Sequence, residues 1–201
     1  MRRVAFILFL LVSLAAGAQD MRSLFVNAPD SVFPLLPRSA REDCVDFLDA
    51  GMRARVTNRL DGKSQLLSLT PVYLKLRSSE YSTFEARLLP CGGDTVIAVV
   101  RSVCAEACDS RVSFYRRDWS PAPVAFEMPR VADFFAPTDS LSHYLSLCDI
   151  YLVKLTLSPT EETMVAEYTM PLYMNDSDAK AVQPLLRPVV YRWRGGVFVK
   201  E

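Results

Sequence analysis

Histidine and glycine are scarce in this chain of 201 residues, which contains one His and seven Gly. A single His excludes metal sites built from several histidines and mechanisms that need separate histidines as acid and base. The sequence has no glycine-rich phosphate loop and no Gly-x-Ser-x-Gly nucleophile motif. Basic and acidic residues are equal in number, 23 of each, so no net charge favours nucleic acid as a partner. Motifs alone therefore predict no catalytic residues, no metal site and no cofactor.

A composition that is 50% apolar and 23% charged is typical of a folded globular protein. At the start of the chain, Arg2 and Arg3 precede an apolar run, residues 4–14, and small residues follow it. This order predicts a secretory signal peptide over residues 1–18. The alternative, a membrane anchor, needs about 20 apolar residues, and this run is shorter. We therefore expect an exported protein, periplasmic or extracellular, with no transmembrane segment in the mature chain.

All five cysteines lie in the part of the chain that we expect to be exported, where an oxidising compartment permits disulfides. Cys104 and Cys108 are separated by three residues and lie between two apolar runs, so a hairpin here would allow a disulfide between them. The alternatives are two inert buried thiols or a reactive pair, although redox pairs usually have two intervening residues. Cys44 and Cys148 fall on the apolar faces of predicted helices, where cysteine behaves as a small hydrophobic residue.

The sequence pattern predicts two related halves, and the alternative is a chance likeness between helix-plus-hairpin segments of similar composition. Short apolar segments bracketed by prolines, residues 29–37 and 129–137, recur in the two halves, and a helix pattern follows each of them. Strand patterns then follow each helix, and the connections between them are too short for parallel crossovers. The recurrence of these features in the same order indicates an internal duplication.

Local signals mark the ends of the first helix. Ser39 and Glu42 have the spacing of a capping box, which predicts the helix start, and Gly51 predicts its end. Residues 53–59 are expected to add a basic, solvated turn or two. In the second half, the helix is expected to place an apolar stripe over residues 141–148.

These patterns predict an α+β fold of two tandem related units, residues 19–124 and 125–201. Each unit is expected to contain a short helical segment and one helix packed on a three- or four-stranded antiparallel sheet. Gly195 and Gly196 lie between two strand patterns and predict a two-residue hairpin.

One signal for binding combines aromatic and basic residues late in each half. Because tryptophan and arginine are enriched at binding hot spots, these residues are candidates for a binding surface. The simpler interpretation is that the aromatic side chains fill the core while the arginines face solvent. The candidates are Arg116, Arg117, Trp119, Arg192, Trp193 and Arg194.

Other polar features carry no catalytic signature. His143 lies in a serine-rich stretch that we expect to be exposed, and nothing beside it completes a catalytic triad. Residues 175–178 look slightly like a calcium loop but lack the Gly and the terminal Glu of an EF-hand, so we expect a hairpin tip. We therefore predict a non-enzymatic binding or interaction module. The alternative is a hydrolase or carbohydrate-active enzyme whose carboxylates converge only in the fold.

Short motifs through most of the mature chain resemble an uncharacterised family of exported proteins from Bacteroidales, known only as a domain of unknown function. The motifs are Leu36-Pro37, Arg41 to Asp43, Leu60-Asp61-Gly62, Leu69-Thr70, Asp109-Ser110-Arg111, Phe114-Tyr115 and Trp119. The resemblance implies a small periplasmic or surface-exposed protein. It implies no catalytic residues and no required disulfide. The expected partner is an unknown envelope or extracellular protein or glycan.

Overall fold

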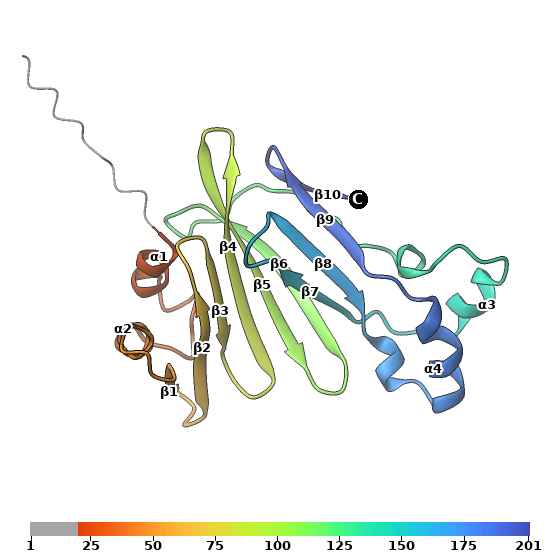
Figure 1. Ribbon diagram of the computed structural model, residues 1–201, viewed down its shortest axis with the longest axis horizontal. Helices are drawn as coiled ribbons and strands as arrows, with labels where there is room; N and C mark the ends of the chain where they lie inside the picture. Colours follow the sequence, from red (N-terminus) through yellow and green to blue (C-terminus); the bar gives the residue numbers. More distant parts are fainter. Residues whose placement is uncertain (1–19) are drawn as a thin grey trace, which may run out of the picture.

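Two antiparallel sheets form the centre of the structure, a computed structural model that describes residues 20–201 (Figure 1). The predicted signal peptide lies outside the described residues. The first sheet is a six-stranded meander in chain order: β1 (Arg55–Thr57), β2 (Lys63–Leu69), β3 (Tyr73–Arg77), β4 (Ser82–Cys91), β5 (Asp94–Cys104) and β6 (Cys108–Tyr115). The second sheet has the order β10-β9-β8-β7 and contains β7 (Val153–Leu157), β8 (Thr163–Tyr168), β9 (Val189–Arg194) and β10 (Val197–Lys200).

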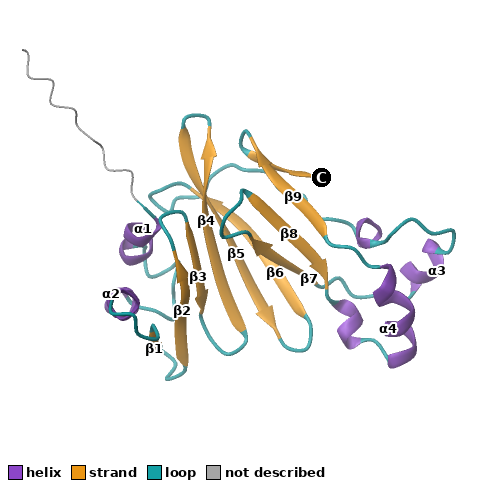
Figure 2. Ribbon diagram, in the orientation of Figure 1, coloured by secondary structure: helices purple, strands orange, loops and turns teal. Residues whose placement is uncertain are grey.

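Short helices lie at the two ends of the molecule (Figure 2). The first half supplies α1 (Met21–Asn27) and α2 (Arg38–Asp49). At the opposite end lie 3₁₀ and α-helical segments: η1 (Val131–Phe134), α3 (Leu141–Ser146), η2 (Met170–Tyr173), α4 (Asp176–Val182) and η3 (Gln183–Leu185). The α+β fold class is confirmed, with a helix-and-sheet arrangement in each half.

The central strands of the six-stranded sheet are covered on both faces, which gives the fold three layers. Alternation along β5 sends Ile97 and Val99 into a core beneath α1 and α2, while Ala98 and Val100 enter a second core shared with the four-stranded sheet. We call these two faces the helix face and the inter-sheet face. The two-sided burial explains why the middle of β5 is a continuous apolar run rather than an alternating one.

The second half departs from the expected packing. The apolar stripe of Leu141, Tyr144, Leu145 and Cys148 is present but only half-buried. Helix α3 packs against η1 and does not cover the second sheet, so the expected helix-on-sheet packing is wrong here. Instead, Val153, Leu155 and Leu157 of β7 pack toward the inter-sheet face. The first sheet also has six strands rather than three or four. Burying the second sheet against the first removes the need for a covering helix, because one sheet can bury the apolar face of another.

The ends of α2 show which local signals succeeded. Gly51 has a φ of +68°, and its N–H donates to the carbonyl of Leu48 while the N–H of Met52 donates to Phe47. This pattern is a Schellman motif, and it confirms the predicted helix end. The predicted capping box is wrong, because the helix begins at Arg38 after the N-cap residue Pro37.

Two further predictions concern a strand and a hairpin. Residues 55–57 form strand β1 rather than a continuation of the helix. Gly195 and Gly196 have φ values of +58° and +113° and join β9 to β10, with Arg194 opposite Val197. Positive φ at both central residues matches the twist of a two-residue hairpin, so this prediction is confirmed.

Candidate functional site

The two predicted tryptophans lie in the cores rather than on a surface. Trp119 is 8% exposed, packs against Phe33 on the helix face and donates from Nε1 to the carbonyl of Leu24 at 3.1 Å. Its φ of +64° is unusual for a large residue and places the ring beneath α1. The indole therefore fixes α1 to the sheet.

Trp193 has the equivalent role on the other face of the six-stranded sheet. It is 4% exposed, packs against Phe114 and Phe198, and donates from Nε1 to the carbonyl of Pro90 at 2.6 Å. Trp119 and Trp193 thus occupy different cores, and they do not share a binding surface. Both tryptophans fill a core, as the simpler interpretation predicts. Alternation along β9 accounts for Trp193, whereas Trp119 lies in the loop after β6.

The four predicted arginines are spread over loops and strand surfaces. Arg116 donates to the carbonyl of Pro121 at 2.9 Å, and Arg117 lies within 3.5 Å of the Thr95 hydroxyl. Arg192 pairs with Glu201 at 2.6 Å, and Arg194 is exposed at the end of β9. Their role in binding stays a prediction.

The structure also places the predicted cysteine pair, His143 and residues 175–178. Cys104 and Cys108 are joined by a disulfide across the β5–β6 hairpin. His143 is exposed on α3. The expected hairpin tip at residues 175–178 is wrong, because the side chain of Asn175 accepts the N–H groups of Ser177 and Asp178 and caps α4.

A basic depression lies at the β1–β2–β3 corner of the six-stranded sheet. It has a volume of ≈ 720 Å³. Four of the lining residues are cations and one, Glu80, is a carboxylate. The lining residues are Arg53, Arg55, Gly62, Lys63, Gln65, Arg77, Ser79, Glu80 and Tyr81.

Strand register aligns the central residues of the basic depression. Arg55 lies opposite Gln65, and Gln65 lies opposite Arg77, so the three residues form one row across β1, β2 and β3. Strands are spaced about 4.8 Å apart, which puts the backbones of the two arginines about 10 Å apart. The row continues through Thr83 and Ser102, so it lies on the inter-sheet face.

The second sheet leaves this corner open. Strand β7 contacts β4, β5 and β6, and Figure 1 shows β1 and β2 extending beyond the second sheet. A sheet face that is not covered by another layer carries polar residues, and here most of them are basic. The open corner therefore presents positive charge on a chain whose overall net charge is zero.

Two of the four cations are occupied by neutral partners. Arg53 donates to the side-chain oxygen of Gln65 at 3.2 Å, and Lys63 donates to the hydroxyl of Thr57 at 2.6 Å. Within residues 20–201, Arg55 and Arg77 have no side-chain hydrogen bond or ion pair. The basic depression therefore holds positive charge that no carboxylate of the described chain neutralises through an ion pair.

Sequence reasoning missed this site because it assigned residues 53–59 to a helical turn. No local pattern marked the site, because β1 begins only at Arg55, and the N–H of Arg55 donates to the carbonyl of Arg53 in a turn before the strand. Arg53 and Arg55 line one depression with Lys63 and Arg77 because of the register of three strands, which the sequence does not reveal. Among residues 20–201, no group of three or more His, Cys, Asp or Glu side chains is arranged to hold a metal ion.

The sequence matches the family described as "Protein of unknown function (DUF3256)" over residues 13–198. The chain belongs to this DUF3256 family. The predicted resemblance to a family of unknown function is thereby confirmed, while export stays a prediction.

A solved structure shares the DUF3256 fold of this chain. It is described as "Structure of a domain of an uncharacterized protein from Porphyromonas gingivalis W83". The two chains are 24% identical with a TM-score of 0.76, over 90% of this chain and 96% of the other. No curated protein matches the chain. No described helix is long and apolar enough to cross a membrane.

Several motif residues that carried the DUF3256 resemblance have structural roles. Arg41 is 1% exposed and donates to the carbonyls of Ala28 and Leu36 at 2.6 and 2.8 Å. Burial is the main cause that lowers the pKa of its guanidinium, and the nearby Asp30 opposes this effect. Ser110 accepts the N–H of Leu155 at 3.0 Å. These residues preserve the fold, so they do not identify a reaction.

Proposed function

We propose that this protein is a non-enzymatic binding module that holds an anionic glycan in the basic depression. The observation that carries the proposal is the row of Arg55, Gln65 and Arg77, in which both arginines lack a partner within the described chain. Guanidinium groups bind carboxylate and sulfate oxygens through paired hydrogen bonds. A ligand with negative groups along its length fits a row of cations better than a neutral ligand does.

Neutral residues in the basic depression favour a glycan over other anions. Gln65, Ser79 and Tyr81 stand among the cations and offer hydrogen bonds to hydroxyl groups. Tyr81 is 59% exposed and presents an aromatic surface with a polar end. Charged and hydroxyl groups alternate in acidic polysaccharides, which matches this mixture. Nothing in residues 20–201 favours the alternative of a hydrolase or carbohydrate-active enzyme.

Binding to heparin, used as a sulfated probe, tests the proposal. We expect binding that weakens as salt is added, because exposed charges are screened. The double substitution Arg55→Gln and Arg77→Gln is expected to weaken binding about tenfold, which corresponds to about 1.4 kcal/mol. The control is Lys180→Gln with Arg187→Gln, which removes the same charge from exposed positions elsewhere.

Three outcomes would contradict the glycan proposal. Equal weakening by both double variants would mean that only net charge matters. Tighter binding of single-stranded DNA than of heparin would favour a different polyanion. An unchanged affinity after Arg55→Gln and Arg77→Gln would remove the basic depression as the site. Circular dichroism and thermal unfolding of each variant establish that the fold is retained.

We propose further that the protein meets its ligand outside the cytoplasm. The predicted signal peptide and the Cys104–Cys108 disulfide support this location, because disulfides persist in oxidising compartments. Mass spectrometry of the protein from fractionated cells tests it. We expect a mature chain that begins at Gln19 in the periplasmic or surface fraction, whereas an intact cytoplasmic chain would contradict the proposal.

A further inference from the structure

A small apolar pocket lies on the helix face of the six-stranded sheet, away from the basic depression. It has a volume of ≈ 200 Å³ and lies between the segment 32–36 and strands β3 to β5. Its apolar lining includes Val32, Leu36, Leu76, Phe84 and Val103. Val103 is 63% exposed, so the pocket opens to solvent beside it.

A cation stands in the lining of this apolar pocket. The guanidinium of Arg101 lies 4.9 Å from the centre of the Phe84 ring and 6.0 Å from that of Tyr115. It also donates to the carbonyl of Val32 at 3.5 Å, the long limit of a hydrogen bond. Within residues 20–201, Arg101 has no ion pair with a carboxylate. The side chain is therefore held in place by aromatic rings while its charge stays unneutralised.

A second arginine lies directly across the strands from the first. Register pairs Arg101 of β5 with Arg111 of β6, on the same face of the sheet. Arg111 is exposed and, in the described part of the chain, makes no ion pair. Like charges directly opposite each other on a sheet are destabilising. An anion bound at Arg101 would offset this repulsion.

We propose that this pocket binds a small amphiphilic carboxylate, with its carboxylate on Arg101, its alkyl chain beside Leu76 and Phe84, and added positive charge from Arg111 on the neighbouring strand. The apolar lining buries the chain, and the two arginines select the charged end. A neutral alcohol lacks the charged group, and a short carboxylate lacks the apolar chain. The site is independent of the basic depression, because the two lie on opposite faces of the sheet.

Titrations of the mature protein with hexanoate, hexanol and acetate test this proposal by NMR. We expect hexanoate to bind at least tenfold more tightly than either of the other two compounds. Its chemical-shift changes should centre on Phe84, Arg101 and Val103. Equal binding of hexanol and hexanoate, or shifts confined to other residues, would overturn the proposal.

Three variants separate the site from nonspecific binding. Arg101→Gln is expected to weaken hexanoate binding about tenfold, and Arg111→Gln to weaken it by a smaller factor. Val103→Glu places a competing carboxylate at the opening and should abolish binding, while Val197→Glu adds the same charge at another exposed strand position. If Val103→Glu and Val197→Glu reduce binding equally, the pocket is not the site. Both valines are exposed, so the comparison does not depend on core packing.

Discussion

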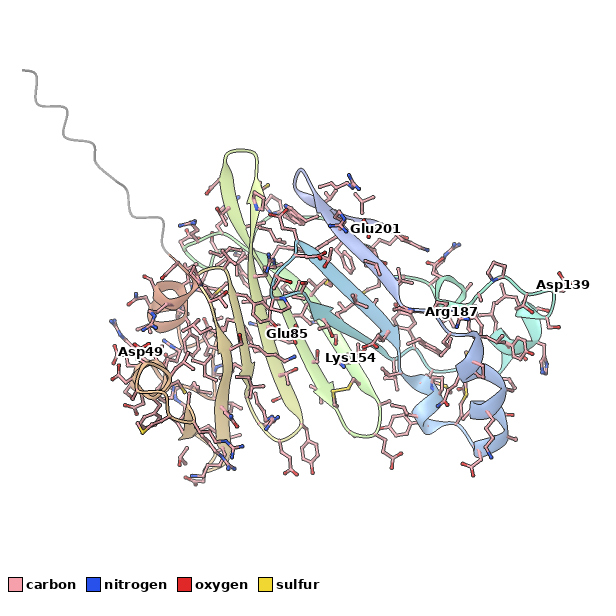
Figure 3. All side chains as sticks on the ribbon, in the orientation of Figure 1. Asp49, Glu85, Asp139, Lys154, Arg187 and Glu201 are labelled. Carbon is pink, nitrogen blue, oxygen red and sulfur yellow. A yellow bond between two sulfur atoms is a disulfide. The ribbon has the colours of Figure 1, made fainter. Side chains whose placement is uncertain are left out.

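The carboxylate of Glu85 on β4 accepts the backbone N–H of Leu157 on β7 at 2.9 Å. This hydrogen bond joins the two sheets at the place where Glu85 is labelled in Figure 3. Ser110 accepts the N–H of Leu155 in the same way, so side chains of the first sheet satisfy the open edge of the second. An edge strand otherwise leaves unpaired donors, and buried unpaired donors are costly.

Glu85→Ala is expected to lower the free energy of unfolding by about 2–3 kcal/mol, because a buried backbone donor and Lys75 both lose their charged partner. The Glu85 side chain is 6% exposed, and its second oxygen lies 2.8 Å from Lys75 Nζ. Urea unfolding measures the difference. Glu167→Ala is the control, because the ion pair of Glu167 with Lys154 is exposed and its loss should change stability by less than about 0.5 kcal/mol. Equal losses in the two variants would contradict this role of Glu85.

Arg41→Met is expected to destabilise the fold by about 3 kcal/mol, because the buried carbonyls of Val26, Ala28 and Leu36 would lose their donor. Thermal and urea unfolding measure the loss. The matched control is Arg38→Met, one turn earlier in α2, whose exposed pair with Glu42 contributes about 0.5 kcal/mol or less. A loss below 1 kcal/mol in Arg41→Met would mean that water replaces the guanidinium at these carbonyls.

Short-range signals predicted much of this fold. The Gly195–Gly196 hairpin follows from conformational freedom at two neighbouring residues, and alternation predicted most of the strands. The end of α2 at Gly51 has the same local origin. These features depend on residues close in the sequence, where periodicity and turn chemistry are informative.

The packing of the two sheets could not be predicted in this way. Glu85 and Leu157 are 72 residues apart, and nothing near either residue indicates the contact between them. The same holds for Arg55 and Arg77, which lie in one row of the sheet only because both are paired with Gln65 of β2. Both candidate sites thus depend on strand register, and that is why a search for local motifs favoured the tryptophans instead.

Removal of the Cys104–Cys108 disulfide is expected to cost about 2 kcal/mol, because so short a loop restricts the unfolded chain only modestly. The double substitution Cys104→Ser and Cys108→Ser should show this loss in urea unfolding without a reductant. Dithiothreitol should lower the stability of the natural protein to a similar level and leave the double variant unchanged. A reductant effect that persists in the double variant would point to another disulfide.

Acid is expected to weaken the fold through aspartates that have basic partners. The hydrogen bond from Arg59 lowers the pKa of Asp30, and that from Arg22 lowers the pKa of Asp49. A carboxyl group whose pKa is lower in the folded state stabilises the fold above its unfolded value, and this stabilisation is lost as pH falls through the folded value. We therefore expect the free energy of unfolding to be constant near neutral pH and to decline below about pH 4. Urea unfolding at pH 7, 4 and 3 measures the decline, which should be smaller in a variant with Asp30→Asn and Asp49→Asn. Because both aspartates are exposed, that variant should still fold, and an identical decline in the two proteins would show that other groups cause the acid sensitivity.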